Sequence, residues 1–162
     1  MSELLWFVAH TRPRCEKKLL EYCQRHQLSA TLPCADSAHK YRGKTVSFSK
    51  PIFPGYVFLQ LEPGQAQTVR QSQHVANLLD VFDQATFAEQ LNAILMALKS
   101  DLEIRLAPAI DAGMHVRIKA GPLRGIEGWV EQRSGMATVL LRLDFIGQAA
   151  AVKVDADLLE LI

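Results

Sequence analysis

The chain has 162 residues, of which 49% are hydrophobic and 22% are charged, and its formal net charge is +1. This composition is typical of a globular protein and excludes a disordered one, and no apolar run approaches the roughly 18–20 residues that a helix needs to cross a bilayer. Cys15, Cys23 and Cys34 are spaced for neither a disulfide framework nor a zinc site, so we expect reduced thiols in a cytoplasmic protein that holds no metal.

The charge is distributed unevenly along the chain. Residues 1–50 contain nine Lys and Arg against four Asp and Glu, whereas residues 101–162 contain seven against nine. The first part is therefore predicted to present a basic surface suited to phosphate or to an acidic partner, although a solvated charged face would give a weaker form of the same pattern. A net charge this low argues against tight, purely electrostatic binding to DNA.

The first fifty residues predict a strand, a helix, a second strand and a hairpin. Residues 4–9 are an almost continuous apolar run, which is typical of a buried strand. Thr11 precedes Pro13, a pattern that predicts a helix start. One face of that helix is formed by Cys15, Leu19, Tyr22, Cys23 and His26. A further strand is expected near residues 29–34, and a basic hairpin is expected around Tyr41-Arg-Gly-Lys44, with Gly43 at its tip.

The segment Pro51-Ile-Phe-Pro-Gly-Tyr-Val-Phe58 carries more aromatic surface than one core needs. Its prolines and glycine restrict the backbone, so it should enter a sheet at an edge or a bulge. Side chains alternate along the strand that follows, so Tyr56 and Phe58 share one face and Val57 and Leu59 the other. Both faces are apolar, and we expect one to cover the core and the other to meet a partner, unless both rings belong to the core.

The rest of the chain predicts an α/β part followed by an all-β part. After Pro63-Gly64 we expect a short helix at residues 65–73, a strand at 75–82 and a helix that starts with the capping box Thr86-Phe-Ala-Glu89. Residues 1–100 thus have the split βαβ order, an antiparallel sheet with flanking helices, and residues 101–111 are predicted to be a linker. In residues 112–162 the apolar period is two and six glycines mark turns, which predicts a small five-stranded β-barrel and an α+β fold class overall.

Three motifs together resemble those of the NusG family of transcription elongation and antitermination factors. Trp6-Phe-Val-Ala-His-Thr-Arg-Pro-Arg-Cys-Glu-Lys-Lys18 is similar to the start of the family's NGN domain, and residues 51–58 are similar to the signature of that domain. Val116-Arg-Ile-Lys-Ala-Gly-Pro-Leu-Arg-Gly-Ile-Glu-Gly-Trp-Val130 looks like a KOW motif, which implies that the barrel is SH3-like. The motifs occur in the order and spacing of the family and span nearly the whole chain.

The resemblance implies a factor that docks on the clamp helices of RNA polymerase, bridges the cleft over DNA and suppresses pausing or termination. Tyr56 and Phe58 match positions that the family uses for docking, and Gln67 and Thr68 lie near a polar motif that specialised relatives place against the opposite side of the cleft. The polymerase-binding residues expected on this basis are Trp6, Phe53, Tyr56, Phe58, Gln67 and Thr68. Aromatic anchors in a pocket dominate many protein–protein affinities, which agrees with this assignment.

In the relatives, the region after the first strand faces upstream DNA or the exposed non-template strand. Arginine can bind phosphate or stack on a base, and the rings of His10 and Tyr41 could offer flat faces to unpaired bases. The DNA-binding residues expected on this basis are His10, Arg12, Arg14, Lys17, Tyr41 and Arg42. The alternative for any one of them is an exposed charge that only solvates the start of the helix.

The KOW barrel of the family recruits a partner, either the termination factor Rho or the small-subunit ribosomal protein NusE. The resemblance places this contact at Phe145-Ile146-Gly147-Gln148, with Phe145 and Ile146 as protruding anchors unless one of them is tucked into the barrel. The compact length, and the residues Gln148-Ala-Ala-Ala151 after the loop, resemble a specialised RfaH-like paralogue. We expect a monomer that requires no cofactor and contacts no membrane.

Two other classes of function have less support. The sequence contains no H-x-x-x-H, C-x-x-C, Walker A or nucleophile-elbow pattern, so catalysis is not expected. A free-standing KOW-type RNA-binding or ribosome-associated module would explain the basic hairpin, but it would leave the aromatic residues of the 51–58 segment without a partner.

Overall fold

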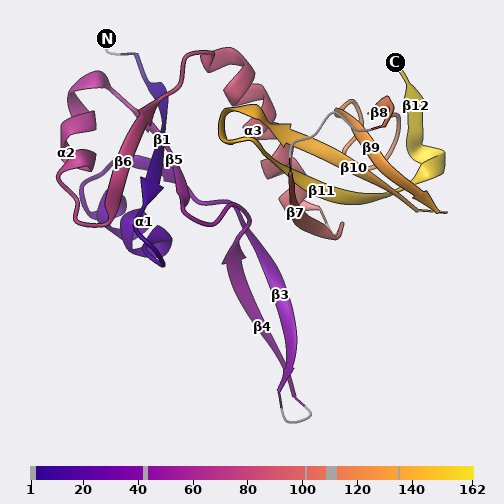
Figure 1. The fold of residues 1–162 in the computed structure, drawn as a ribbon, viewed down its shortest axis with the longest axis horizontal. Helices are drawn as coiled ribbons and strands as arrows, with labels where there is room; N and C mark the ends of the chain where they lie inside the picture. Colours follow the sequence, from indigo (N-terminus) through magenta and orange to yellow (C-terminus); the bar gives the residue numbers. More distant parts are fainter. Residues whose placement is uncertain (1–2, 42–43, 101, 109–112, 135) are drawn as a thin grey trace. The chain divides into compact units, whose positions relative to one another are not determined.

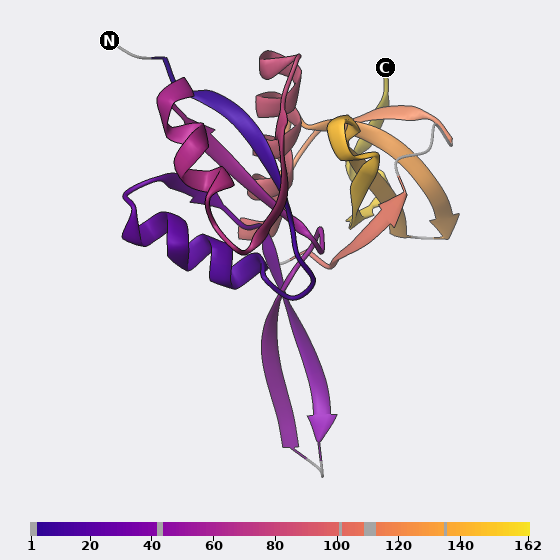
Figure 2. The ribbon, with the colours of Figure 1, turned by 60° about the vertical axis from the view of Figure 1, so that its left-hand side comes forward.

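The computed structural model of the chain describes residues 3–41, 44–100, 102–108, 113–134 and 136–162. The chain divides into two compact units, one formed by residues 1–34 and 53–85 and the other by residues 35–52 and 86–162. Figure 1 labels the helices and strands in chain order, and Figure 2 shows the same ribbon after a 60° turn. No helix in the described ranges is long and apolar enough to cross a membrane.

The first unit is built on an antiparallel sheet whose described strands lie in the order β2, β5, β1, β6. The bounds of its elements are β1 Leu5–Thr11, α1 Glu16–Arg25, β2 Ser29–Thr31, β5 Tyr56–Leu61, the 3-10 turn η1 Pro63–Gln65, α2 Ala66–Arg70 and β6 Val75–Asp80. The sequence of strands and helices agrees with the predicted split βαβ order. The predicted fold class, an antiparallel sheet with flanking helices, is confirmed for this unit.

One face of this sheet is covered by α1 and α2. Phe7 of β1 and Val57 and Leu59 of β5 share a buried cluster with Leu19 of α1 and Val69 of α2. Strand side chains reach this face at every second position, and helix side chains reach it at every third or fourth position. The spacing of apolar residues in the strands and in the helices, both visible in the sequence, therefore accounts for the core of the first unit.

A two-stranded hairpin, β3 (Cys34–Tyr41) and β4 (Lys44–Pro51), forms a sheet of its own in the described part of the chain. The strand expected at residues 29–34 is instead divided, because β2 ends at Thr31 and β3 begins at Cys34. Pro33 lies between them, and proline cannot donate a backbone hydrogen bond to a ladder. The expected hairpin is confirmed, whereas its predicted tip, Gly43, lies outside the described residues.

The second unit contains a larger antiparallel sheet, whose described strands lie in the order β12, β8, β9, β10, β11, β7. The bounds are α3 Gln84–Lys99, β7 Ile104–Pro108, β8 His115–Ile118, β9 Glu127–Ser134, β10 Met136–Leu143, the 3-10 turn η2 Asp144–Ile146, β11 Gln148–Asp155, the 3-10 turn η3 Ala156–Leu158 and β12 Leu159–Leu161. The first two residues of α3 belong to the first unit. The all-β character predicted for residues 112–162 is confirmed in the described residues of that range.

One of these strands lies in the segment predicted to be a linker. Residues 104–108 form β7, which pairs with β11 from Val152↔Ile104 to Gln148↔Pro108, so the sheet has one strand more than the five expected. Ala149 and Ala151 of β11 are small, and Ala107 of β7 is buried in a cluster with them. The domains expected at residues 1–100 and 112–162 stay a prediction. The compact units are defined by contacts within the structure and assign residues 35–52 and 86–100 to the second unit.

Helix α3 begins at Gln84, two residues before the capping box expected at Thr86. The Gln84 carboxamide accepts a hydrogen bond from the Trp6 backbone N–H at 2.6 Å, and its Nε2 donates to the Trp6 and Val81 carbonyls, both at 2.9 Å. The pairing of β1 with β6 ends at Phe7↔Asp80. Beyond that pair, the Gln84 side chain supplies the hydrogen-bond acceptor and donor that the Trp6 backbone of β1 needs. The helix start predicted from the capping box at Thr86 is wrong, because the bonds of Gln84 to Trp6 and Val81 place the first turn of α3 two residues earlier.

Candidate functional site

The aromatic residues predicted to form a docking pocket differ in depth. Phe58 is 0% exposed and Phe53 is 1% exposed, and their rings meet edge to face with centroids 6.1 Å apart at 72°. Val8 is the direct partner of Phe58 across the two strands and is also buried. Of the three aromatic rings in the 51–58 segment, only Tyr56 is half-buried and retains accessible surface. As the chain stands, Phe53 and Phe58 are core side chains, and Tyr56 is the ring of this segment that a partner could reach.

Tyr56 stacks on His10, with ring centroids 5.3 Å apart and planes inclined by 28°. The two residues are direct partners in the β1–β5 ladder, and His10 is exposed. Cross-strand pairs of this kind lie close enough for their side chains to pack. The structure therefore joins a residue expected for polymerase and a residue expected for DNA into one partly exposed aromatic surface, which we call the His10–Tyr56 stack.

Gly55 fixes the backbone immediately before this stack. Its carbonyl accepts a hydrogen bond from the Thr11 N–H at 2.8 Å, and its own N–H donates to the Glu16 carboxylate at 3.2 Å. Its φ of 89° lies in the left-handed region that glycine adopts without strain. A Cβ at this position would lie 3.6 Å from the His10 ring, an ordinary contact, so the glycine is required by its conformation. Sequence reasoning did not identify Glu16 as the residue that ties α1 to this corner.

The predicted basic residues follow the end of β1. Arg12, Arg14 and Lys17 are all exposed. The Arg12 N–H donates to the His74 carbonyl at 2.9 Å, and the β1–β6 register shifts between His10 and Thr11. Arg14 has a φ of 61°, which is uncommon for a residue other than glycine. Of the other expected DNA-binding residues, Arg42 and the side chain of Tyr41 lie outside the described structure.

The remaining predicted polymerase contacts do not all share this face. Trp6 is half-buried and lies two residues from Val8 and four residues from His10 along β1, so it is on the face of Tyr56. Gln67 and Thr68 are on α2, which packs through Ala66 and Val69 on the opposite face. The Thr68 carbonyl accepts a hydrogen bond from the Tyr22 hydroxyl at 2.8 Å. The structure thus brings Trp6, His10, Tyr56 and Phe58 to one face and leaves Gln67 and Thr68 apart from them.

The loop predicted to bind a partner of the barrel is held by α3 within the second unit. Phe145 and Ile146 are half-buried in η2, and the Phe145 ring meets Phe87 of α3 edge to face with centroids 6.1 Å apart. The Gln90 carboxamide donates to the Asp144 carboxylate at 2.8 Å and accepts from the Asp144 N–H at 2.9 Å. This contact leaves the anchors partly covered, and the sequence carried no signal for it because the two segments are more than fifty residues apart.

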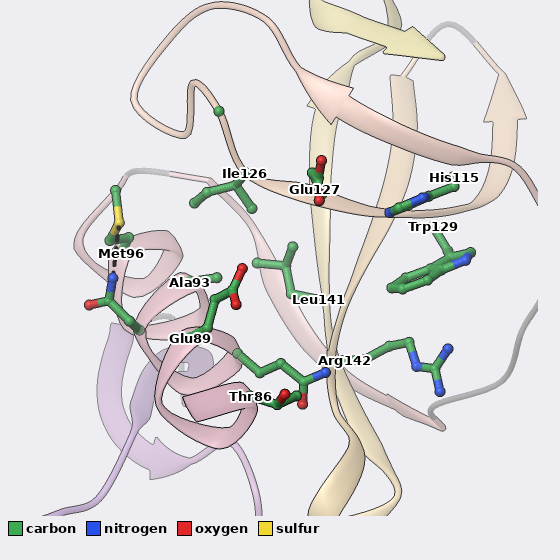
Figure 3. A pocket seen from close by; sticks show the side chains of 13 residues that line it. Thr86, Glu89, Ala93, Met96, His115, Ile126, Glu127, Trp129, Leu141 and Arg142 are labelled. Atoms are coloured by element: carbon green, nitrogen blue, oxygen red, sulfur yellow. Dashed lines mark hydrogen bonds between the residues drawn. The ribbon is translucent and has the colours of Figure 1, made fainter. Parts of the chain in front are cut away.

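A pocket of about 390 Å³ lies in the same unit between α3 and the sheet. In Figure 3, Ala93 and Met96 of α3 lie across the pocket from Leu141, and Trp129 lines its far side. His115 stacks on Trp129 with centroids 4.6 Å apart, and the Arg142 guanidinium lies 4.8 Å from the centre of the indole. Arg142 is also paired with Asp144 at 2.9 Å. His115, Trp129 and Arg142 therefore form a packed stack of two aromatic rings and one guanidinium.

Cys15, Cys23 and Cys34 are free thiols in the structure. Burial raises the pKa of the Cys23 thiol to about 11, because desolvation disfavours the thiolate. This thiol therefore stays protonated near neutral pH, and the stability that its burial contributes is lost as the pH rises from the ordinary thiol pKa towards 11. No group of three or more His, Cys, Asp or Glu side chains that could hold a metal ion occurs in the described part of the chain.

Comparison with known proteins relates this geometry to one family. Residues 4–93 match the family model described as "Transcription termination factor nusG". A solved structure described as "Domain interaction in Thermotoga maritima NusG" is similar over 99% of this chain and 98% of that chain, with a TM-score of 0.60 and 16% identity, a likeness that concerns the fold. No curated protein matches the chain.

Proposed function

Because this chain belongs to the NusG family of transcription factors, whose members generally bind RNA polymerase, we propose that it docks on the clamp helices of the polymerase. From there it bridges the cleft over DNA and suppresses pausing or termination. The observation that carries the proposal is the partly exposed His10–Tyr56 stack, which the exposed cations Arg12 and Arg14 follow along the chain.

In this proposal Tyr56 is the polymerase anchor, and His10 extends its apolar surface. A half-buried aromatic ring supported by a packed core offers contact area at a low cost in conformational entropy. Phe53 and Phe58 support the strand from within and do not contact the partner themselves. Trp6, on the same face, lies at the rim of the docking surface.

The DNA contact in this proposal is secondary to docking. Arg12, Arg14 and Lys17 are exposed at the end of β1 and the start of α1, where they can reach phosphate oxygens. A net charge of +1 cannot supply tight electrostatic binding, so polymerase must provide the affinity and hold the DNA within reach. Gln67, Thr68, Tyr41 and Arg42 remain predicted contacts.

We further propose that Phe145 and Ile146 recruit a protein partner of the barrel, either NusE or Rho. Phe87 and Gln90 contact the same loop, so a partner that takes both anchors has to replace those contacts. This proposal agrees with the half-buried state of both anchors, which leaves part of each side chain accessible.

The proposal is tested with the full chain and purified core RNA polymerase. We expect Tyr56→Ala to weaken binding by about tenfold or more, as truncation of an interface anchor does, and Tyr56→Phe to retain most of the affinity because the ring stays. Arg117→Ala, an exposed residue paired with Glu127 in the other unit, is the matched control and should bind normally. Equal affinity of Tyr56→Ala and the wild type would overturn the docking surface, and preferential binding to ribosomal RNA would overturn the function.

A further inference from the structure

Phe82, in the loop between β6 and α3, is 94% exposed. The next most exposed large apolar side chain in the described residues is Leu161, at 66%. Val81, the residue before Phe82, is buried, so the chain turns one apolar side chain inward and the next one fully outward. Nothing in the proposed docking of Tyr56 uses this ring.

The loop that carries Phe82 is fixed at both ends. The Val81 carbonyl accepts a hydrogen bond from Gln84 Nε2 at 2.9 Å, and the same carboxamide is bonded to both backbone groups of Trp6. Phe82 and Asp83 therefore span a short gap between two anchored residues. The exposure of the ring is set by this backbone and does not result from a loose segment, so little conformational entropy remains to be lost when a partner binds.

The surroundings of Phe82 are acidic. Residues 71–98 contain no Lys or Arg, and Asp80 and Asp83 flank the ring as exposed residues. The register Phe7↔Asp80 brings the start of β1 beside the end of β6, and this part of β1 is preceded by the exposed residues Glu3 and Leu4. Carboxylates at this corner repel phosphate and so disfavour nucleic acid as the partner. An apolar anchor among carboxylates instead fits a protein pocket rimmed by Lys or Arg.

We propose that Phe82 is the anchor of a second contact with RNA polymerase, made with an apolar pocket that has a basic rim. This inference rests on the proposed function. The contact lies in the loop beyond the Phe7↔Asp80 pair, whereas the His10–Tyr56 stack lies near the other end of β1. Two anchors on one compact unit raise the affinity together, because the first contact places the second at a high effective concentration.

The experiment measures the affinity of the full chain for purified core RNA polymerase. Phe82→Ala should weaken binding by about tenfold, with an unchanged thermal midpoint because the ring is outside the core. Leu161→Ala, which removes a comparable exposed apolar side chain in the other unit, should change neither value. Asp80→Lys with Asp83→Lys should also weaken binding, most strongly at low salt, since the basic rim would then face like charge.

The possible results distinguish the loss of the Phe82 contact from a failure of the proposed binding to polymerase. If the wild type binds polymerase and Phe82→Ala binds equally well, the second contact is overturned and the docking of Tyr56 stands. If the wild type does not bind polymerase, both are overturned. If Phe82→Ala changes only the sedimentation of the free protein, the ring serves contact with a second copy of the chain, and the polymerase contact is again overturned.

Discussion

At the scale of single residues, neighbouring aromatic side chains on one strand have different roles. The alternation of side chains correctly places Tyr56 and Phe58 on the same face, but it does not determine how deep each one lies. Depth depends on Val8 across the ladder and on Phe53 from the preceding turn, and both cover Phe58 but leave Tyr56 accessible. The sequence therefore predicts which side chains share the face of a candidate site, but not which of them are accessible to a partner.

We expect Phe58→Ala to lower the free energy of unfolding by about 3–5 kcal/mol, because removal of a fully buried aromatic ring leaves a cavity. Urea unfolding followed by tryptophan fluorescence measures the loss, since Trp6 lies on the same face. Tyr56→Ala is the comparison and should cost much less, as its ring is half-buried. A loss below about 1 kcal/mol for Phe58→Ala would show that this ring is not part of the core.

At the scale of secondary structure, the Gln84 side chain acts as part of the sheet. We expect Gln84→Ala to destabilise the first unit by about 1–3 kcal/mol, because the Trp6 and Val81 backbone groups lose their partners. Gln84→Glu should cost at least as much above the carboxyl pKa, since a carboxylate accepts but cannot donate to the two carbonyls. Hydrogen exchange at the Trp6 amide measures the change, and Gln71→Ala, an exposed residue after α2, is the control.

The elements that the sequence predicted are those with strong local patterns. The apolar runs at residues 4–9 and 55–61 become β1 and β5, and the helical stripe from Leu19 to Cys23 becomes the buried side of α1. Strand β7 was missed because Pro108 and scattered charge suggest a linker, while its pairing depends on the small side chains of β11. A strand that forms only because a partner edge is open leaves no local signal.

At the scale of the whole molecule, the proposed function assigns docking and DNA contact to different residues of the first unit. We expect Arg12→Ala with Arg14→Ala to reduce crosslinking to DNA in an elongation complex and to leave the affinity for polymerase unchanged. The remaining DNA contact should also depend less on salt, because each lost phosphate contact removes part of the counterion release. Arg117→Ala, whose guanidinium is paired with Glu127 and Glu160, is the matched control. Equal loss of both activities would show that these arginines also hold the polymerase.

At Arg14 the left-handed backbone conformation lowers the stability of the fold, whereas the side chain serves the proposed contact with DNA. At a φ of 61° a side chain with a Cβ costs about 1–2 kcal/mol relative to a residue free to adopt that conformation. Glycine would relax the loop between β1 and α1, and it would also remove a guanidinium from the surface proposed to reach DNA. Selection of variants for thermal stability alone would therefore favour the loss of this cation, so a stabilised form of the protein should be checked at this position before its activity on DNA is interpreted.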